Sequence, residues 1–228
     1  MKWENEIENL VFDKRTLLNI AKLMKKGLLD RIEGIVSQGK EANVFLGKQG
    51  EREIAVKIYR SETTNFQNRM KYLLQDPRIK KVKKTQYDLA CAYASREFKN
   101  LQIAHQLIQD VPQPFHHEGN VILMDFLGKE GIPYPQLMYE EVSKQDFQDL
   151  WEKLWRLWEG GLVHADISEY NILKGPRNYI IDWGQGLPRK SEMGLTYFKR
   201  DLQNLIRFFK KRGIDVEEAE SRLRALES

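Results

Sequence analysis

The chain has few of the residues that build disulfides, membrane spans or histidine-rich metal sites. Its 228 residues include a single cysteine, Cys91, which excludes an internal disulfide and a zinc site made of cysteines. No apolar run approaches the roughly 18 residues needed to cross a bilayer, and residues 1–6 lack the apolar core of a signal peptide. The four histidines are scattered, and we expect the adjacent pair His116 and His117 in an exposed loop. The sequence therefore predicts a cytoplasmic protein without a membrane partner.

Neither sign of charge dominates, because 37 basic and 33 acidic residues leave a formal net charge of +4. Hydrophobic content of 41% and charged content of 31% are those of a globular protein rather than a disordered one. The basic residues nevertheless cluster, and such clusters can bind nucleic-acid phosphates with an affinity that falls as salt rises. A solvated charged surface is the alternative, and composition does not decide between them. One cluster comprises Arg78, Lys80, Lys81, Lys83 and Lys84, and the other Arg207, Lys210, Lys211 and Arg212.

The order of predicted elements indicates two lobes, for which a chain of this length is sufficient. Apolar spacing up to about residue 32 indicates short amphipathic helices, and residues 42–46 and 54–59 are predicted strands around a turn at 47–50. Further predicted elements are a strand at 121–126, helices at 94–109, 142–159 and 198–212, and a short helix after Asp215. Because strands come early and helices late, we expect a small sheet lobe followed by a helical lobe, with a cleft between them.

Two segments in the C-terminal half carry polar residues at the spacing that phosphoryl transfer requires. Asp166, in the run His-Ala-Asp-Ile-Ser-Glu-Tyr-Asn, can orient an attacking hydroxyl or accept its proton, and Asn171 and Asp182 can hold Mg²⁺ against nucleotide phosphates. Asp and Asn are also common turn formers and helix caps. However, Asp182 follows an apolar run and precedes Trp183 and Gly184, which is the setting of the metal-binding Asp-Phe-Gly turn of protein kinases. We therefore interpret the chain as a kinase.

The early strands offer the residues that a phosphate site would need. Gly39, in the run Ser-Gln-Gly-Lys-Glu-Ala-Asn-Val, would let backbone N–H groups approach phosphate oxygens closely. Lys57 alternates with apolar residues, which often marks a solvent-facing strand position, but it can also reach phosphates if an acidic partner such as Glu97 fixes it. A Walker A loop at residues 34–40 is rejected, because Glu41 stands where a Ser or Thr should bind Mg²⁺ and a strand follows instead of a helix.

With these residues in place, the chain resembles the RIO family of atypical serine/threonine protein kinases, and within it the archaeal type of the first subfamily. The resemblance spans roughly residues 30–212 and rests on six segments: 39–44, 56–59, 97–101, 123–128, 164–172 and 181–185. It implies an α+β, protein-kinase-like two-lobed fold with a small antiparallel-sheet N-lobe, a truncated helical C-lobe and short N-terminal helices. The implied divisions are an extension at 1–31, an N-lobe at 32–128 with the hinge at its end, and a C-lobe at 129–228. The winged-helix domain of the second subfamily does not fit into about 30 residues, which favours the first.

The resemblance also implies roles for individual residues. Asp166 would be the catalytic base, and Asn171 and Asp182 the metal ligands. Because the metal-loop aspartate of this family can accept phosphate transiently, Asp182 would also be catalytic. Gln38 departs from the Thr expected beside Ser37. The residues expected to contact ATP, with Mg²⁺ or Mn²⁺ as its metal, are Ser37, Gly39, Lys40, Val44, Ala55, Lys57, Glu97, Met124, Asp125, Leu127 and Leu173.

The expected function is that of an ATP-dependent kinase that phosphorylates itself and acts in maturation of the small ribosomal subunit. Its partners would be the precursor of that subunit and ribosomal RNA, and its protein substrate is not identified. The alternative is a nucleotide-gated, ribosome-binding ATPase with a phospho-aspartate intermediate. A small-molecule phosphotransferase is disfavoured because nothing resembles a dedicated pocket for such a substrate. The candidate sites of autophosphorylation are Ser61, Thr63, Thr64, Thr85 and Ser95.

Overall fold

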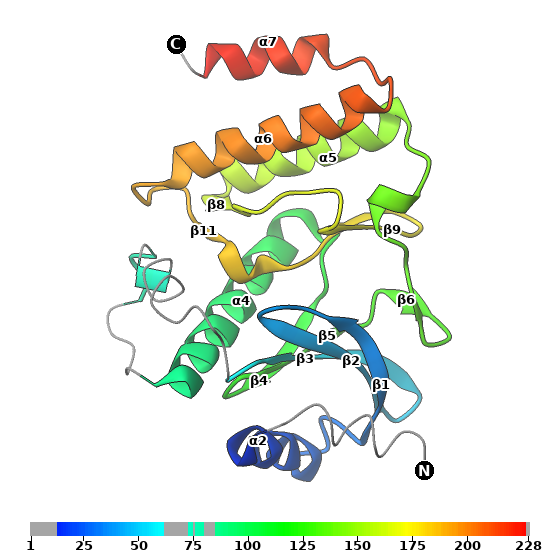
Figure 1. Ribbon diagram of the computed structural model, residues 1–228, viewed down its shortest axis with the longest axis vertical. Coiled ribbons are helices and arrows are strands. Elements are labelled where there is room, and N and C mark those ends of the chain that lie inside the picture. The colour runs from blue at the N-terminus through cyan, green and yellow to red at the C-terminus, as the bar shows by residue number, and fades with distance from the viewer. Residues whose placement is uncertain (1–12, 62–72, 75, 80–84, 227–228) are drawn as a thin grey trace. The chain divides into compact units, whose positions relative to one another are not determined.

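The computed structural model describes residues 13–61, 73–74, 76–79 and 85–226, and these residues form two compact units. Unit 1 comprises the described residues up to Leu73, those of 80–98, and Gln113–Pro133, whereas unit 2 comprises the described residues of Leu74–Ile79, Lys99–Pro112 and Tyr134 onward. Unit 1 contains an antiparallel sheet and unit 2 most of the helices (Figure 1). The predicted α+β class is confirmed.

The sheet of unit 1 has the strand order β1-β2-β3-β5-β4, and every neighbouring pair is antiparallel. The central strands β2 (Ala42–Gln49), β3 (Arg52–Tyr59) and β5 (Val121–Asp125) were predicted, but β2 and β3 extend further than expected. The predicted turn at 47–50 was too long, because Gly47 and its neighbours continue the ladder with β3. Only Gly50 and Glu51 connect the two strands, and Gly50 has the positive φ of 56° that a tight hairpin favours.

The two edge strands, β1 (Arg31–Gln38) and β4 (Pro114–Glu118), were not predicted from the sequence. The expectation that His116 and His117 lie in an exposed loop was wrong, because both belong to β4 and are half-buried. The His117 ring lies 5.4 Å from that of Phe98, measured between centroids. Pro114, which has no N–H to donate, is tolerated because it begins an edge strand.

Helix α2 (Lys14–Lys25) covers one face of this sheet. Asp13 caps its first turn by accepting a hydrogen bond from the Thr16 amide at 2.8 Å. The helix buries Ile20 and Leu23 in a core with side chains that alternate along the strands, as residues on one face of a sheet do. Those strand residues are Phe45, Ile54, Val56, Ile58, Val121 and Leu123. The helical prediction for this region is confirmed over α2, and residues 1–12 lie outside the described residues.

In unit 2, helices α5 (Lys144–Glu159) and α6 (Gly194–Lys211) pack side by side, and α7 (Glu217–Ala225) lies against α6 (Figure 1). Helix α4 (Gln86–Ile108) contributes residues to both units. The sequence predicted all four helices, although α4 and α6 begin earlier than expected. Trp158 of α5 stacks on Phe198 of α6 with ring centroids 4.4 Å apart, so this tryptophan packs between the two helices.

Short elements connect these helices and complete the chain. In unit 1, β6 (Gly128–Lys129) pairs with β7 (Ile132–Pro133). In unit 2, β8 (Leu162–Val163) pairs with β11 (Leu187–Pro188), and β9 (Ile172–Lys174) with β10 (Asn178–Ile180). The 3₁₀ turns are η1 (Leu137–Tyr139) and η2 (Trp183–Gln185). Within the described part of the chain, no helix combines the length and the apolar character that a membrane crossing requires.

Candidate active site

Five of the predicted nucleotide contacts lie on one face of the unit 1 sheet. Ser37 pairs with Val44, and Val44 in turn pairs with Lys57 on the next strand. Ala55, two residues before Lys57, pairs with Met124. Directly paired residues, and residues two apart on one strand, present their side chains on the same face. This face is opposite to the one that α2 covers, because α2 packs on the alternate residues.

Lys57 and Glu97 form the predicted ion pair. The Lys57 Nζ lies 2.7 Å from Glu97 Oε1, and their side chains are only 8% and 1% exposed. The second carboxylate oxygen of Glu97 accepts a hydrogen bond from the Tyr59 hydroxyl at 2.6 Å. Tyr59 was not singled out from the sequence, yet it holds the carboxylate that fixes the lysine. A buried ammonium with such a partner is oriented rather than free to sample rotamers.

Gly39 has a different role in the structure from the one expected. Its amide donates to the Ala42 carbonyl at 2.9 Å, so this N–H closes the turn between β1 and β2. A Cβ atom at Gly39 would lie 2.7 Å from the same carbonyl oxygen, which explains why the turn needs glycine. Lys40 is exposed in this turn. The turn therefore offers the side chain of Lys40, rather than the Gly39 amide, to a phosphate.

The predicted hinge residues follow from β5 into a loop. Met124 and Asp125 end β5, and Leu127 is half-buried between β5 and β6. The Asp125 carboxylate is already engaged, because it accepts hydrogen bonds from Arg52 at 2.9 Å and from the Gln113 amide at 3.2 Å. Asp125 could thus contact a nucleotide through its backbone, with its side chain holding the strand end in place.

In unit 2, hydrogen bonds join Asn171 both to Asp166 and to Ile181, the residue before Asp182. The Asn171 amide group donates to the Asp166 carbonyl at 2.8 Å and to its carboxylate at 3.2 Å. The Ile181 N–H donates to the Asn171 carbonyl at 2.9 Å. Asn171 immediately precedes β9 and Asp182 closely follows β10, so the β9–β10 hairpin places them together. Leu173 lies on β9, paired with Tyr179.

Asp182 adopts a backbone conformation that is costly for a residue with a side chain. Its φ of 64° and ψ of 69° lie in the left-handed region, and Ala165, next to Asp166, has a φ of 66°. Such conformations persist only where the surrounding contacts impose them, and they are concentrated at functional sites. Asp182 belongs to the predicted catalytic set, and Ala165 directly precedes Asp166, which also belongs to it.

His164 contacts both the segment of Asp166 and the segment of Asp182. It was not singled out from the sequence as a site residue. Its Nε2 lies 3.0 Å from the Ile181 carbonyl oxygen, and its Nδ1 lies 3.2 Å from the Asp166 amide, which donates to it. These partners assign the neutral tautomer with the proton on Nε2. The ring also packs edge-on against Trp183, with centroids 4.6 Å apart. His164 thereby fixes the backbone on both sides of the predicted site.

Helix α6 holds the backbone of the loop that carries Asp166. The buried Asp201 carboxylate accepts hydrogen bonds from the Ala165 amide at 2.7 Å and the Ile167 amide at 3.0 Å. Asn204 donates to the Ile167 carbonyl at 3.0 Å, and Arg200 donates to the Ala165 carbonyl. The sequence offered one signal for this, an aspartate among the apolar residues of an amphipathic helix.

Asp201 should make stability depend on pH. Burial raises its pKa to about 7, although hydrogen bonds from Ile167 and Ala165 and the nearby Arg200 act in the opposite direction. The unfolded chain releases this proton near an ordinary pKa of about 3.9. Between about pH 4 and pH 7 the folded protein therefore keeps a proton that the unfolded chain has lost, and the free energy of unfolding falls as pH rises.

We expect Asp201→Asn to remove this part of the pH dependence, because an amide has no proton to exchange in this range. This pH dependence is measured by urea unfolding of wild type and Asp201→Asn at several pH values between 4.5 and 7.5. The difference in unfolding free energy between wild type and Asp201→Asn should shift by up to about 4 kcal/mol over the full interval from pH 4 to pH 7. A difference that stays constant with pH would show that Asp201 does not titrate in this range.

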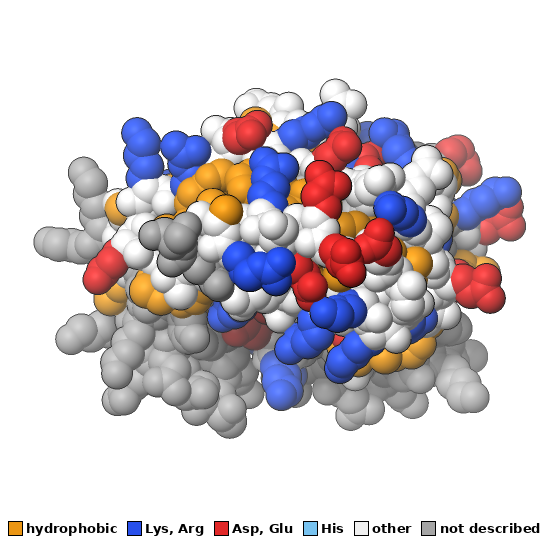
Figure 2. Space-filling view, turned by 90° about the horizontal axis from the view of Figure 1, so that it is seen from above, with side chains coloured by type: hydrophobic (Ala, Val, Ile, Leu, Met, Phe, Trp, Pro, Cys, Tyr) orange, Lys and Arg blue, Asp and Glu red, His pale blue; other side chains and the backbone are white. Residues whose placement is uncertain are grey.

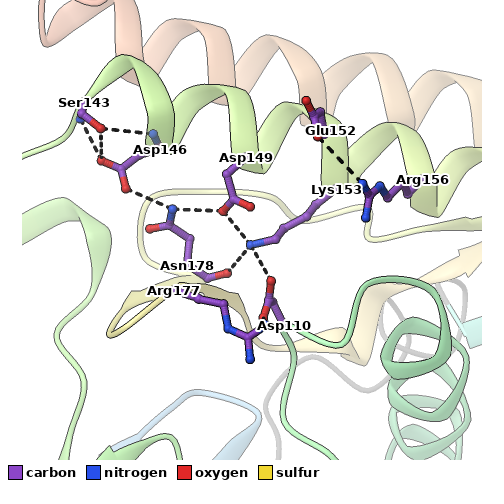
Figure 3. A network of polar contacts seen from close by, with 9 residues as sticks. All are labelled: Asp110, Ser143, Asp146, Asp149, Glu152, Lys153, Arg156, Arg177 and Asn178. Carbon is purple, nitrogen blue, oxygen red and sulfur yellow. Dashed lines mark hydrogen bonds and ion pairs between the residues drawn. The ribbon is translucent and has the colours of Figure 1, made fainter.

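A buried lysine anchors the hairpin that carries Asn171 and Asp182 (Figure 3). Lys153 of α5 is 6% exposed, and its Nζ lies 3.0 Å from Asp110 Oδ2 and 2.6 Å from Asp149 Oδ2. It also donates to the Asn178 carbonyl at the start of β10, at 2.9 Å. Asp110 makes a second link to that strand, because its carbonyl accepts a hydrogen bond from the Ile180 amide at 3.0 Å.

The first turn of α5 makes the other half of this network. Ser143 and Asp146 form a reciprocal capping box, and Asp146 also accepts a hydrogen bond from Asn178 at 3.1 Å (Figure 3). Lys174 donates a further hydrogen bond to Asp146 at 3.0 Å. Partial burial acts to raise the pKa of Asp146, but the hydrogen bonds from Ser143, Lys174 and Asn178 outweigh it and lower this pKa to about 2. Asp146 is therefore ionised at neutral pH and holds both strands of the hairpin.

The donor atoms at the hairpin fit a Mg²⁺ ion that is bound together with phosphates. Asn171 and Asp182 supply an amide oxygen and a carboxylate, which are the hard oxygen ligands that Mg²⁺ prefers. No group of three or more His, Cys, Asp or Glu residues that could enclose a metal occurs among the described residues. Mg²⁺ ordinarily takes one or two protein carboxylates and completes its shell with substrate phosphates and water, which this set allows.

The structure describes little of the first basic cluster, but it shows contacts made by the second. Of the first, only Arg78 is described, and Lys80, Lys81, Lys83 and Lys84 lie outside the described residues, as do Thr63 and Thr64. In the second, Lys210 pairs with Glu220 at 2.7 Å, and Arg212 donates to the carbonyls of Met138 and Glu140. Figure 2 shows acidic, basic and apolar side chains interspersed on the face seen from above, rather than one continuous basic surface.

Comparison with known proteins identifies the family of this chain. The RIO domain model matches residues 43–222. The chain is 37% identical to the RIO-type serine/threonine-protein kinase Rio1 of Methanocaldococcus jannaschii, covering 91% of this chain and 72% of that protein. It is 33% identical to the serine/threonine-protein kinase RIO1 of Caenorhabditis elegans, covering 90% of this chain but only 42% of that longer protein. The fold resembles the Rio2 kinase–ADP/Mg²⁺–phosphoaspartate complex of Chaetomium thermophilum, with a TM-score of 0.66 and 19% identity over 92% of this chain and 68% of that one.

Proposed function

Because the chain belongs to the RIO family of serine/threonine protein kinases, and within it to the archaeal type of the first subfamily, we propose that it transfers the γ-phosphoryl group of ATP to serine or threonine hydroxyls, its own among them. The observation that carries the proposal is the hydrogen-bonded set of Asp166, Asn171 and Ile181, which directly precedes Asp182. Oriented lysine and carboxylate side chains serve phosphoryl transfer, which depends on positioning and charge stabilisation rather than on covalent chemistry of the protein.

Each residue has a defined task in this proposal. Asp166 orients the attacking hydroxyl and accepts its proton, and its exposed position suits contact with an incoming substrate. Lys57, fixed by Glu97, binds phosphate oxygens. Asn171 and Asp182 hold Mg²⁺, which neutralises charge on the β and γ oxygens when bound. The remaining contacts with ATP fall to Ser37, Lys40, Val44, Ala55, Met124, Asp125, Leu127 and Leu173, and Gly39 allows the turn that presents Lys40.

The second candidate is an ATPase in which Asp182 accepts the phosphoryl group. An oxygen of the Asp182 carboxylate would attack the γ-phosphorus, the bond to the ADP oxygen would break, and water would later hydrolyse the acyl phosphate. The Chaetomium thermophilum Rio2 kinase, which shares the fold, forms a complex described as ADP/Mg²⁺–phosphoaspartate. The constrained backbone of Asp182 is compatible with this role.

One labelling experiment separates the two candidates. The purified protein is incubated with γ-labelled ATP and Mg²⁺, and label is followed in protein and in free phosphate, with a chelator-treated sample as the control. We expect label on Ser or Thr that resists hydroxylamine if protein phosphorylation is the working activity. Rapid free phosphate with a hydroxylamine-labile adduct would favour the ATPase. Neither labelled protein nor free phosphate above the chelator control would refute both.

The finer assignments extend this proposal. We assign the precursor of the small ribosomal subunit and its RNA as partners, which the family resemblance and the basic residues at 78–84 support. Mn²⁺ could replace Mg²⁺ because the same oxygen donors suit it. The lobe boundaries at 31/32 and 128/129 and the cytoplasmic location stay predictions.

A further inference from the structure

The turn that follows Asp182 is held by an asparagine that the proposed chemistry leaves without a role. Asn100 of α4 is fully buried, and its side-chain nitrogen donates to the Trp183 carbonyl at 2.9 Å and to the Gly186 carbonyl at 2.7 Å. These two carbonyls lie at the two ends of the turn 183–186 that directly follows Asp182. A single amide group therefore closes this turn from outside.

Glycine at position 186 makes this close approach feasible. A Cβ atom there would lie 2.7 Å from the Asn100 side-chain nitrogen, closer than packed atoms tolerate. The backbone of Gly186 has an ordinary negative φ of −55°, so the glycine is not needed for its conformation. The contact with Asn100 accounts for it.

The amide of Asn100 is itself fixed by an arginine. The Asn100 Oδ1 accepts a hydrogen bond from Arg78 at 2.8 Å, which sets the orientation that presents the nitrogen to the two carbonyls. Arg78 is oriented by the buried Asp76, whose Oδ1 accepts from Arg78 Nε at 2.8 Å and from the Arg78 amide at 3.0 Å. Buried polar groups connected in this way act as one network, because each bond fixes the next donor or acceptor.

We propose that Asn100 is a positioning residue for Asp182, and that Arg78 and Asp76 orient the Asn100 amide for this task. Asp182 has a left-handed backbone that needs support. On one side of it the Ile181 N–H donates to Asn171, and on the other the Trp183 carbonyl accepts from Asn100. Loss of the Asn100 amide would let the turn relax and move the carboxylate out of place. The inference rests on the proposed function, in which Asp182 binds Mg²⁺.

The test measures how strongly Mg²⁺ enhances ADP binding. Calorimetry gives the affinity for ADP with and without Mg²⁺ for wild type, Asn100→Ala and Arg78→Ala. Removing a side chain that orients a metal ligand typically costs about 10- to 100-fold in metal affinity or activity. We expect the Mg²⁺ enhancement to fall by about 10-fold or more in Asn100→Ala and less in Arg78→Ala, whereas ADP affinity without Mg²⁺ stays unchanged. A purely structural role would not produce this selective loss.

A control variant, a second variant and the wild type itself are needed to interpret the measured Mg²⁺ enhancement. Gln102→Ala changes an exposed residue of the same helix and should behave as wild type. If Asn100→Ala does not fold, Arg78→Ala decides, because the Arg78 side chain is partly exposed and its loss keeps Asn100 but removes the group that orients its amide. Unchanged Mg²⁺ enhancement in folded Asn100→Ala, or in Arg78→Ala where only that variant folds, would overturn the inference. A wild type whose ADP affinity does not respond to Mg²⁺ would instead refute the proposed function.

Discussion

Asp166→Ala is expected to lower the rate of phosphoryl transfer by about 10²- to 10⁴-fold, the range that positioned proton transfer supplies. Asp166 is exposed, and its carboxylate is oriented by Asn171 at 3.2 Å. Because the proposed contacts with the nucleotide and its metal fall to other residues, affinity for ATP should remain close to that of wild type. Steady-state turnover and ATP binding by calorimetry, measured on the same samples, provide the check.

Two further variants make the comparison specific. Glu169→Gln removes a charge from the same loop and should retain wild-type turnover, since the Met138 amide donates to the Glu169 backbone carbonyl, which the substitution keeps. Asp182→Ala should also abolish turnover but weaken Mg²⁺ binding, and the double variant with Asp166→Ala should be little worse than the poorer single variant, because residues that act as one unit are not additive. Wild-type turnover in Asp166→Ala would remove it from the mechanism.

Lys153→Met is expected to lower the free energy of unfolding by about 3 kcal/mol. Removing one partner from a buried ion pair leaves a buried charge without compensation, which costs about 3–5 kcal/mol. Asp110 keeps Arg177 as a partner at 3.0 Å, which places the expected value at the lower end. Methionine retains the apolar length of the lysine, so the change isolates the ammonium group. Urea unfolding at pH 7 measures the effect.

The same helix provides a matched control for Lys153. Glu152 and Arg156 form an ion pair at 3.9 Å whose side chains are 68% and 65% exposed (Figure 3). Such exposed pairs contribute at most about 1 kcal/mol, and often nothing measurable. Tryptophan fluorescence suits both variants, because Trp151, Trp155, Trp158 and Trp183 lie in unit 2. Equal losses in Lys153→Met and Arg156→Ala would show that burial of the network contributes nothing.

The sequence alone determined the elements whose signals are local. Helix α5 was predicted because apolar residues recur on one face, and the structure adds a capping box at Ser143. Strands β2, β3 and β5 were predicted because their buried residues form apolar runs. The segments with Asp166 and Asp182 were recognisable because the chemistry requires particular residue types at short, fixed spacing.

Only the tertiary structure decided the edge strands and the supporting residues of the site. Neither β1 nor β4 contains a buried residue or an apolar run like those of β3 and β5, and each is a strand because it pairs with β2 or β5. Asp201 acts on a residue 36 positions away, and Asn100 on one 83 positions away. Nothing in the local sequence specifies such pairs, because a hydrogen bond between distant segments forms only after the chain has packed them together.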